Sequence, residues 1–135
     1  MAESITIHGT PHLAADLYLP PHASGPVPAV VTGPGFGGVK EMLIPRFAEA
    51  LADAGIATLA VDYAGFGQSG GEPRQDIKPR GQIHDLRRGL DQLCRDARID
   101  PHRLGTFGTS MSGAHALVLA GTDARVRAAV TMVPF

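Results

Sequence analysis

A serine flanked by small residues, between a predicted strand and a predicted helix, is the feature that most constrains this chain. Residues 107–113 read FGTSMSG, follow a short apolar stretch and open a run rich in helix formers. The pattern predicts a sharp corner in which Ser110 has a strained backbone, so the residues two positions to either side, Gly108 and Ser112, must be small. We expect Ser112 to be a small packing residue rather than a second nucleophile. The Ser110 hydroxyl should then project at the carboxyl edge of a sheet, beside the first free N–H groups of a helix.

Apolar runs and turn residues along the chain predict one α/β domain. A length of 135 residues fits one ordinary domain, and 44% hydrophobic residues are enough for a core. Strands are expected at 4–8, 13–19, 27–31, 56–61, 103–107 and 126–133. Helices are expected at about 40–54, 79–97 and 110–120, and Pro45 should interrupt or delay the first of them. The first two strands form a hairpin, and the strand–helix–strand units after it predict a mostly parallel sheet.

Three loops rich in glycine or serine follow predicted strands, at 33–38, 65–71 and 108–113. Ligands of such sheets bind beyond the carboxyl ends of the strands. We therefore expect the three loops to converge on one crevice beside Ser110. Met42, Phe47 and Met111 are candidates to line an acyl pocket there, or simply to pack in the core or at its rim.

Five segments resemble, in the same order, those of the α/β-hydrolase superfamily, in particular the dienelactone-hydrolase-like esterases and the related polyketide-transferase-like hydrolases. The segments are 34–41 (PGFGGVKE), 62–69 (DYAGFGQS), 71–76 (GEPRQD), 100–105 (DPHRLG) and 107–113. They match the amino-terminal half of such a domain. The resemblance therefore implies that residues 1–135 form a single partial α/β-hydrolase domain, with an antiparallel N-terminal hairpin and a sheet complete only through about strand six.

The same resemblance implies a serine hydrolase that acts on ester, thioester or related acyl bonds of a small molecule, through an acyl-serine intermediate. Ser110 would attack the carbonyl carbon, and the backbone N–H groups of Phe36 and Met111 would form the oxyanion hole. Two residues depart from the family pattern, since Pro34 replaces a histidine and Ala64 replaces a common arginine. The family's catalytic acid and histidine follow later strands and have no matching position here. We therefore expect a fragment, a truncated product or one piece of a two-piece enzyme.

None of the six histidines is expected to replace the missing base. A serine hydroxyl is a poor nucleophile unless a base takes its proton. His115 lies five residues after Ser110 on the same predicted helix, so its side chain should point away from the crevice. The other five are expected to have surface or structural roles, and they are His8, His12, His22, His84 and His102.

Two functions of other classes stay open. The loop from Gly33 to Gly38 fits the dinucleotide-binding pattern G-x-G-x-x-G, and the next strand ends at an acid, Asp62. However, its last glycines precede the expected helix, and Asp62 is better explained as an acceptor for N–H groups of its own glycine turn. Alternatively, the chain is a catalytically inactive hydrolase fold that serves as a binding module. Its last strand, from Val126 to Val133, would leave an apolar edge that pairs with a second polypeptide or another copy.

Composition argues against several classes of partner. The formal net charge of −1 gives no basis for binding nucleic acid or an anionic membrane surface, and no apolar stretch is long enough to span a bilayer. The start lacks a signal region and the single cysteine, Cys94, excludes an internal disulfide, so we expect a cytoplasmic protein. Cys94 is expected to be half-buried. Scattered histidines at no ligand spacing predict neither a metal nor a cofactor.

Overall fold

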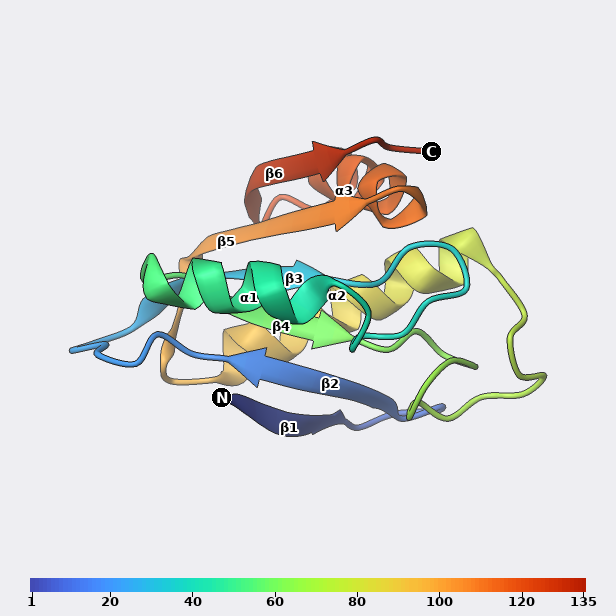
Figure 1. Ribbon diagram of the computed structural model, residues 1–135, viewed down its shortest axis with the longest axis horizontal. Helices are drawn as coiled ribbons and strands as arrows, with labels where there is room; N and C mark the ends of the chain where they lie inside the picture. Colours follow the sequence, from blue (N-terminus) through green and yellow to red (C-terminus); the bar gives the residue numbers. More distant parts are fainter.

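A six-stranded sheet of order β1-β2-β4-β3-β5-β6 forms the centre of the computed structural model, which describes residues 1–135 (Figure 1). The strands are β1 (Ala2–Ile7), β2 (Leu13–Tyr18), β3 (Val27–Thr32), β4 (Ala57–Val61), β5 (Ile99–Thr109) and β6 (Val126–Met132). β2 pairs antiparallel with both β1 and β4, whereas the β3–β4, β3–β5 and β5–β6 pairs are parallel. The expected α/β sheet with an antiparallel N-terminal hairpin is confirmed.

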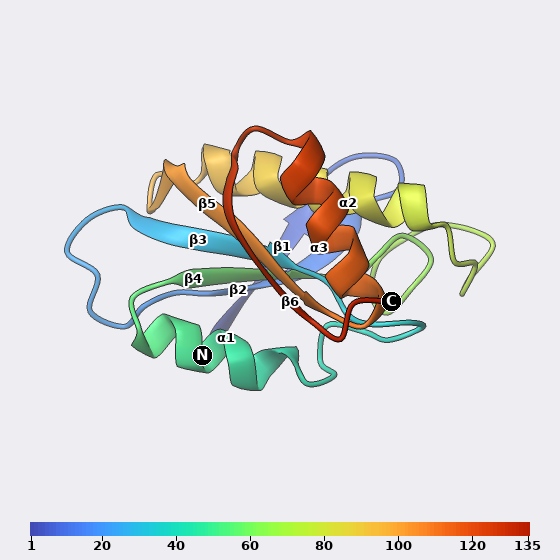
Figure 2. The ribbon, with the colours of Figure 1, turned by 90° about the horizontal axis from the view of Figure 1, so that it is seen from above.

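Helices cover both faces of this sheet (Figure 2). They are α1 (Ile44–Asp53), α2 (Pro79–Arg95) and α3 (Met111–Thr122). α1 lies on one face, and α2 and α3 lie side by side on the other. α2 buries one side of its surface against the sheet. The buried residues include the four apolar ones at the predicted spacing, Ile83, Leu86, Leu90 and Leu93.

The main core lies between the sheet and α2. It contains 18 buried residues, among them Leu59 and Val61 of β4. Ala60, which points to the opposite face of the same strand, belongs to a smaller cluster under α1. Because both faces of β4 are covered, all five of its residues are buried, as a helix-covered parallel strand requires. Gly89 permits the close approach of α2, since a Cβ there would lie 2.7 Å from the Val31 Cγ2.

The first helix begins late, as the expected delay by Pro45 requires, since that proline lies in the first turn of the helix. α1 starts at Ile44 rather than at Lys40. The Lys40 N–H donates to the Asp62 Oδ1 at 2.8 Å, and the Lys40 Nζ forms an ion pair of 3.1 Å with the Asp16 Oδ2. Helical amphipathicity does not reveal these contacts with the sheet, which hold residues before Ile44 in a turn.

Two predictions, about the start of β5 and about Cys94 in α2, were wrong. β5 begins at Ile99 rather than at residue 103, because Ile99 pairs with Val27 before a register shift. Cys94 is exposed rather than half-buried. Leu93, the residue before it, is buried in the core, so the side chain of Cys94 lies on the outer face of α2.

β6 is the edge strand at the C-terminal side of the sheet and pairs with β5 alone. Its exposed apolar side chains include Val130 and Met132, and Val133 follows them. The predicted apolar edge between Val126 and Val133 is therefore present. None of the three helices has both the length and the apolar character of a membrane span.

Candidate active site

Ser110 occupies the corner between β5 and α3, at the N-cap position of the helix. Its backbone has φ +56° and ψ −127°, a conformation that glycine adopts readily and L-residues rarely do. The Ser110 N–H donates to the Met132 carbonyl at 3.0 Å, and the Ser110 carbonyl accepts the N–H groups of Gly113 at 2.9 Å and Phe135 at 3.1 Å. Ser110 therefore has the strained backbone that the sequence predicts, held in place by the end of β6.

Gly108 shows why the corner needs a small residue before the serine. A Cβ built on Gly108 would lie 2.1 Å from the Ser112 carbonyl oxygen and 2.7 Å from the Gly113 nitrogen. Both contacts are with backbone atoms that cannot rotate away. The first turn of α3 thus lies directly against the end of β5.

A cavity of about 190 Å³ lies beside Ser110. Residues 33–38 and the start of α1 form most of its wall, and its apolar lining consists of Phe36, Met42, Leu43, Ile44, Phe47 and Phe107. Two of the three candidate pocket residues, Met42 and Phe47, line it, whereas Met111 is buried outside the lining. A cavity of this composition accommodates an apolar group next to the Ser110 hydroxyl.

The two predicted oxyanion donors belong to segments that adjoin this serine. Gly35 is packed against it, since a Cβ on Gly35 would be 3.6 Å from the Ser110 Cβ. The N–H of the next residue, Phe36, makes no backbone hydrogen bond, although Phe36 belongs to a turn closed by the Gly38 N–H and the Gly35 carbonyl at 3.1 Å. Met111 is the first residue of α3, so its N–H has no partner within the helix. The arrangement suits the oxyanion role, which stays a prediction.

Ser112 makes contacts that sequence reasoning missed. It is 1% exposed, its Oγ donates a hydrogen bond to the Pro34 carbonyl, and the Tyr63 Oη lies 2.5 Å from that Oγ. Pro34 is 78 positions away in the chain, so no local pattern reveals the contact. Its burial agrees with the predicted packing role, to which these two hydrogen bonds add a polar one.

Asp62 connects the loop after β3 with the loop after β4. The residue is completely buried; its Oδ1 accepts the Lys40 N–H at 2.8 Å and its Oδ2 accepts the Gln68 N–H at 2.9 Å. Burial raises the pKa of this carboxyl group. The prediction that Asp62 ties its own glycine turn is confirmed. Because Asp62 is completely buried, and α1 starts well after Gly38, the site does not fit a dinucleotide.

His115 is buried and committed to other partners. Its Nε2 lies 2.8 Å from the Gln82 Oε1, and its ring stands edge-on to Tyr63 with a centroid separation of 5.9 Å. Burial lowers the pKa of this imidazole. The Ser110 side chain makes no capping hydrogen bond to the first turn of α3. The remaining five histidines are exposed, and no cluster of three or more His, Cys, Asp or Glu side chains is arranged to hold a metal ion.

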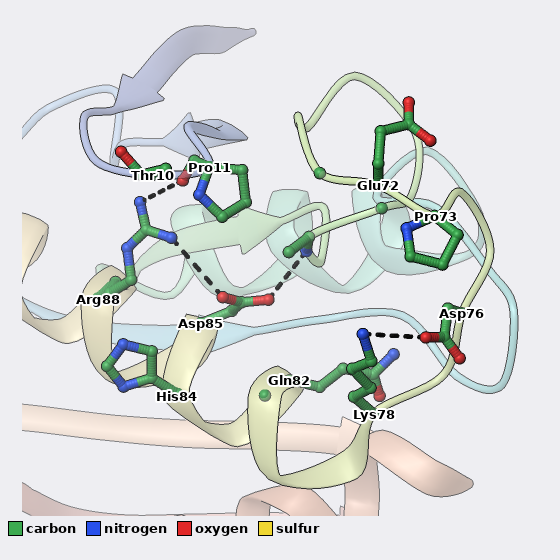
Figure 3. Close-up of a pocket in the computed structure, with 14 residues that line it drawn as sticks. Thr10, Pro11, Glu72, Pro73, Asp76, Lys78, Gln82, His84, Asp85 and Arg88 are labelled. Carbon is green, nitrogen blue, oxygen red and sulfur yellow. Dashed lines mark hydrogen bonds and ion pairs between the residues drawn. The ribbon is translucent and has the colours of Figure 1, made fainter.

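A second cavity, of about 590 Å³, lies between the β1–β2 turn, the loop after β4 and α2 (Figure 3). Gly65 and Gly71 line this cavity and not the one beside Ser110, so the expected convergence of all three loops was wrong for 65–71. The loop turns away because the Gly70 N–H donates to the His12 carbonyl at 3.0 Å. Charges around the cavity pair with each other, as Arg88 does with Asp85 at 3.7 Å.

Comparisons with known proteins agree with this geometry. The sequence model described as alpha/beta hydrolase fold matches residues 28–135. The chain is 39% identical over 132 residues to the thiohydrolase aneE of Aspergillus aculeatus, covering 98% of this chain and 40% of that protein. It is 37% identical over 107 residues to the polyketide transferase af380 of Aspergillus fumigatus, covering 79% and 37%.

Solved structures show the same fold. The hypothetical protein PA2218 of Pseudomonas aeruginosa superposes with a TM-score of 0.94 at 34% identity, over 100% of this chain and 43% of that one. DcsB, solved with a substrate analogue, gives a TM-score of 0.93 at 28% identity, over 100% and 46%. The chain thus spans less than half the length of these relatives. Together, the matched family model, the sheet order and the corner at Ser110 show that this chain belongs to the α/β-hydrolase family.

Proposed function

We propose that the chain carries the nucleophile and the oxyanion hole of a serine-dependent acyl hydrolase or acyltransferase. The observation that supports this most is the position of Ser110, whose side chain does not cap α3 and which lines the same apolar cavity as Phe36, a residue whose N–H makes no backbone hydrogen bond. Homologues with the names thiohydrolase, polyketide transferase and acyltransferase support acyl chemistry on a small molecule.

In the proposed reaction the Ser110 Oγ attacks the carbonyl carbon of an ester or thioester, while a base takes the hydroxyl proton. The carbonyl oxygen becomes negatively charged, and the N–H groups of Phe36 and Met111 donate to it. Removal of one such donor typically slows an enzyme by about 10²- to 10³-fold. Collapse of this intermediate breaks the bond to the leaving alcohol or thiol, which receives the proton, and leaves an acyl group on Ser110. Water or an acceptor alcohol then takes the acyl group.

We propose that the base and its supporting acid come from polypeptide outside these 135 residues, because no histidine lines the cavity beside Ser110. His115 is bonded to Gln82, and every other histidine is exposed. The edge strand β6 ends close to Ser110, whose N–H donates to the Met132 carbonyl. We propose that the polypeptide supplying the histidine pairs along this edge, either as a continuation of the chain or as a second molecule.

Labelling with a fluorophosphonate tests the proposal. Imidazole in the buffer replaces the absent histidine side chain as a base, and peptide mapping identifies the modified residue. We expect Ser110 to be labelled, imidazole to accelerate the reaction, and Ser110→Ala to remain unlabelled. Ser69, buried at 2% exposure, serves as an internal control that stays unmodified. A folded chain that is not labelled at Ser110 would contradict the proposal and favour the inactive binding module.

A further inference from the structure

Ser112 connects the two segments that carry the proposed oxyanion donors. It lies on the first turn of α3, two residues after Ser110, and its Oγ donates to the Pro34 carbonyl. A hydroxyl group has one proton to donate. Because Ser112 gives that proton to Pro34, the short contact of 2.5 Å with Tyr63 requires the Tyr63 hydroxyl to donate to the Ser112 Oγ. The hydrogen bonds therefore run in one direction, from Tyr63 through Ser112 to Pro34.

Tyr63 is a rigid starting point for this series. It is 1% exposed, and its ring lies so close to Gly33 that a Cβ there would be 2.3 Å from the Tyr63 Oη. Burial raises the pKa of the Tyr63 hydroxyl, so the group keeps its proton and stays a donor. The side chain cannot leave without moving the end of β3 or the ring of His115.

The other end of the series fixes the loop that holds Phe36. The bond from Ser112 holds the peptide unit that joins Pro34 to Gly35. The Gly38 N–H, at 3.1 Å from the Gly35 carbonyl, holds the next unit, which carries the Phe36 N–H. In a trans peptide the C=O and the N–H point in opposite directions. Two successive peptide planes are thus oriented, and the Phe36 N–H points away from Gly38.

We infer that Ser112 is a positioning residue for the oxyanion hole. This inference rests on the proposed function of Ser110. Ser112 does not touch the substrate, because it is buried beneath the loop; it acts through the Pro34 carbonyl. It keeps the Phe36 N–H at a fixed place relative to the first turn of α3, where the Met111 N–H lies. A displacement of such a donor by about 1 Å is enough to cost about two orders of magnitude in rate.

The experiment measures the rate of Ser110 labelling by a fluorophosphonate in imidazole, together with the ³¹P chemical shift of the adduct, whose phosphoryl oxygen occupies the oxyanion position. We expect Ser112→Ala to slow labelling by about 10- to 100-fold. Its ³¹P signal should move toward that of the denatured adduct. Thr106→Val is the matched control, because it removes another buried hydroxyl that donates to a strand carbonyl, that of Val31, at 2.9 Å. The control should leave both the rate and the shift unchanged.

Each outcome separates this inference from the function on which it rests. If the unmodified chain is labelled at Ser110 and Ser112→Ala matches it in both rate and ³¹P shift, the inference is overturned and the proposed function stands. If the unmodified chain is not labelled, both fall. Should Ser112→Ala fail to fold, NMR of the unmodified chain decides. A slowly exchanging Ser112 hydroxyl proton with a nuclear Overhauser contact to Gly35 supports the inference, and a rapidly exchanging one refutes it.

Discussion

Replacing Ser110 by glycine should stabilise the chain, because Ser110 holds a backbone conformation of φ +56° and ψ −127° that a side chain disfavours. Such a conformation costs of order 1 to 3 kcal/mol. Glycine relieves that cost but loses about 0.4 to 1 kcal/mol through the greater freedom of the unfolded chain. Ser110→Ala is the reference, since it removes the hydroxyl and keeps the Cβ. We expect Ser110→Gly to exceed Ser110→Ala by about 1 kcal/mol in free energy of unfolding, which is about 3 to 4 °C in Tm for a domain of this size.

Urea denaturation followed by far-UV circular dichroism measures both variants. The same pair of substitutions at Ser24, an exposed loop residue outside the positive-φ region, is the control. There the order should reverse, with alanine the more stable. If Ser110→Gly is no more stable than Ser110→Ala, the backbone at this corner is not strained and the reasoning from its dihedral angles fails.

Three further predictions concern other parts of the structure. Gly108→Ala forces a Cβ to within 2.1 Å of the Ser112 carbonyl oxygen, so it should lower the free energy of unfolding by about 3 kcal/mol or more, or prevent folding. Gly121→Ala, in the same helix as that oxygen, places its Cβ where nothing lies within 4 Å and should raise the free energy of unfolding by up to about 1 kcal/mol. Urea denaturation compares the two variants. Burial lowers the pKa of His115 below its ordinary 6.5, so the folded chain binds this proton less readily than the unfolded chain and loses stability as the pH falls below about 6.5. His115→Gln should flatten that slope in unfolding curves taken between pH 7 and pH 5, and an unchanged slope would be inconsistent with a buried neutral imidazole. Lys40→Met leaves the Asp16 carboxylate without its partner at 3.1 Å and should lower the free energy of unfolding by about 2 to 3 kcal/mol. The double variant with Asp16→Asn should recover part of this loss, and additive losses in the denaturation midpoints would argue against the ion pair.

The order of strands and helices was readable from the sequence because each element has a local pattern. The apolar spacing of Ile83, Leu86, Leu90 and Leu93 identifies α2, and the unbroken burial of β4 follows from its apolar run. The corner at Ser110 was equally visible, because small residues must flank it whatever the rest of the chain does. Local sequence determines these features, and the structure confirms them.

Features that depend on distant partners were not readable. The contacts of Lys40 with Asp62 and Asp16, which hold the residues before α1, have no local signal in the sequence. The loop 65–71 turns toward the β1–β2 turn because Gly70 binds the His12 carbonyl. The role of Ser112 depends on Pro34, 78 residues earlier. In each case a polar contact between residues far apart in the sequence determines the local structure, and the spacing of apolar residues does not predict such a contact.

A crystal structure of the chain phosphonylated at Ser110 tests the central claim most directly. The phosphoryl oxygen of that adduct takes the place of the developing oxyanion. The account predicts that it accepts hydrogen bonds from the Phe36 and Met111 nitrogens, both at about 2.7 to 3.1 Å. An adduct whose oxygen points into solvent, or is bound by other groups while both N–H groups stay free, would contradict the account.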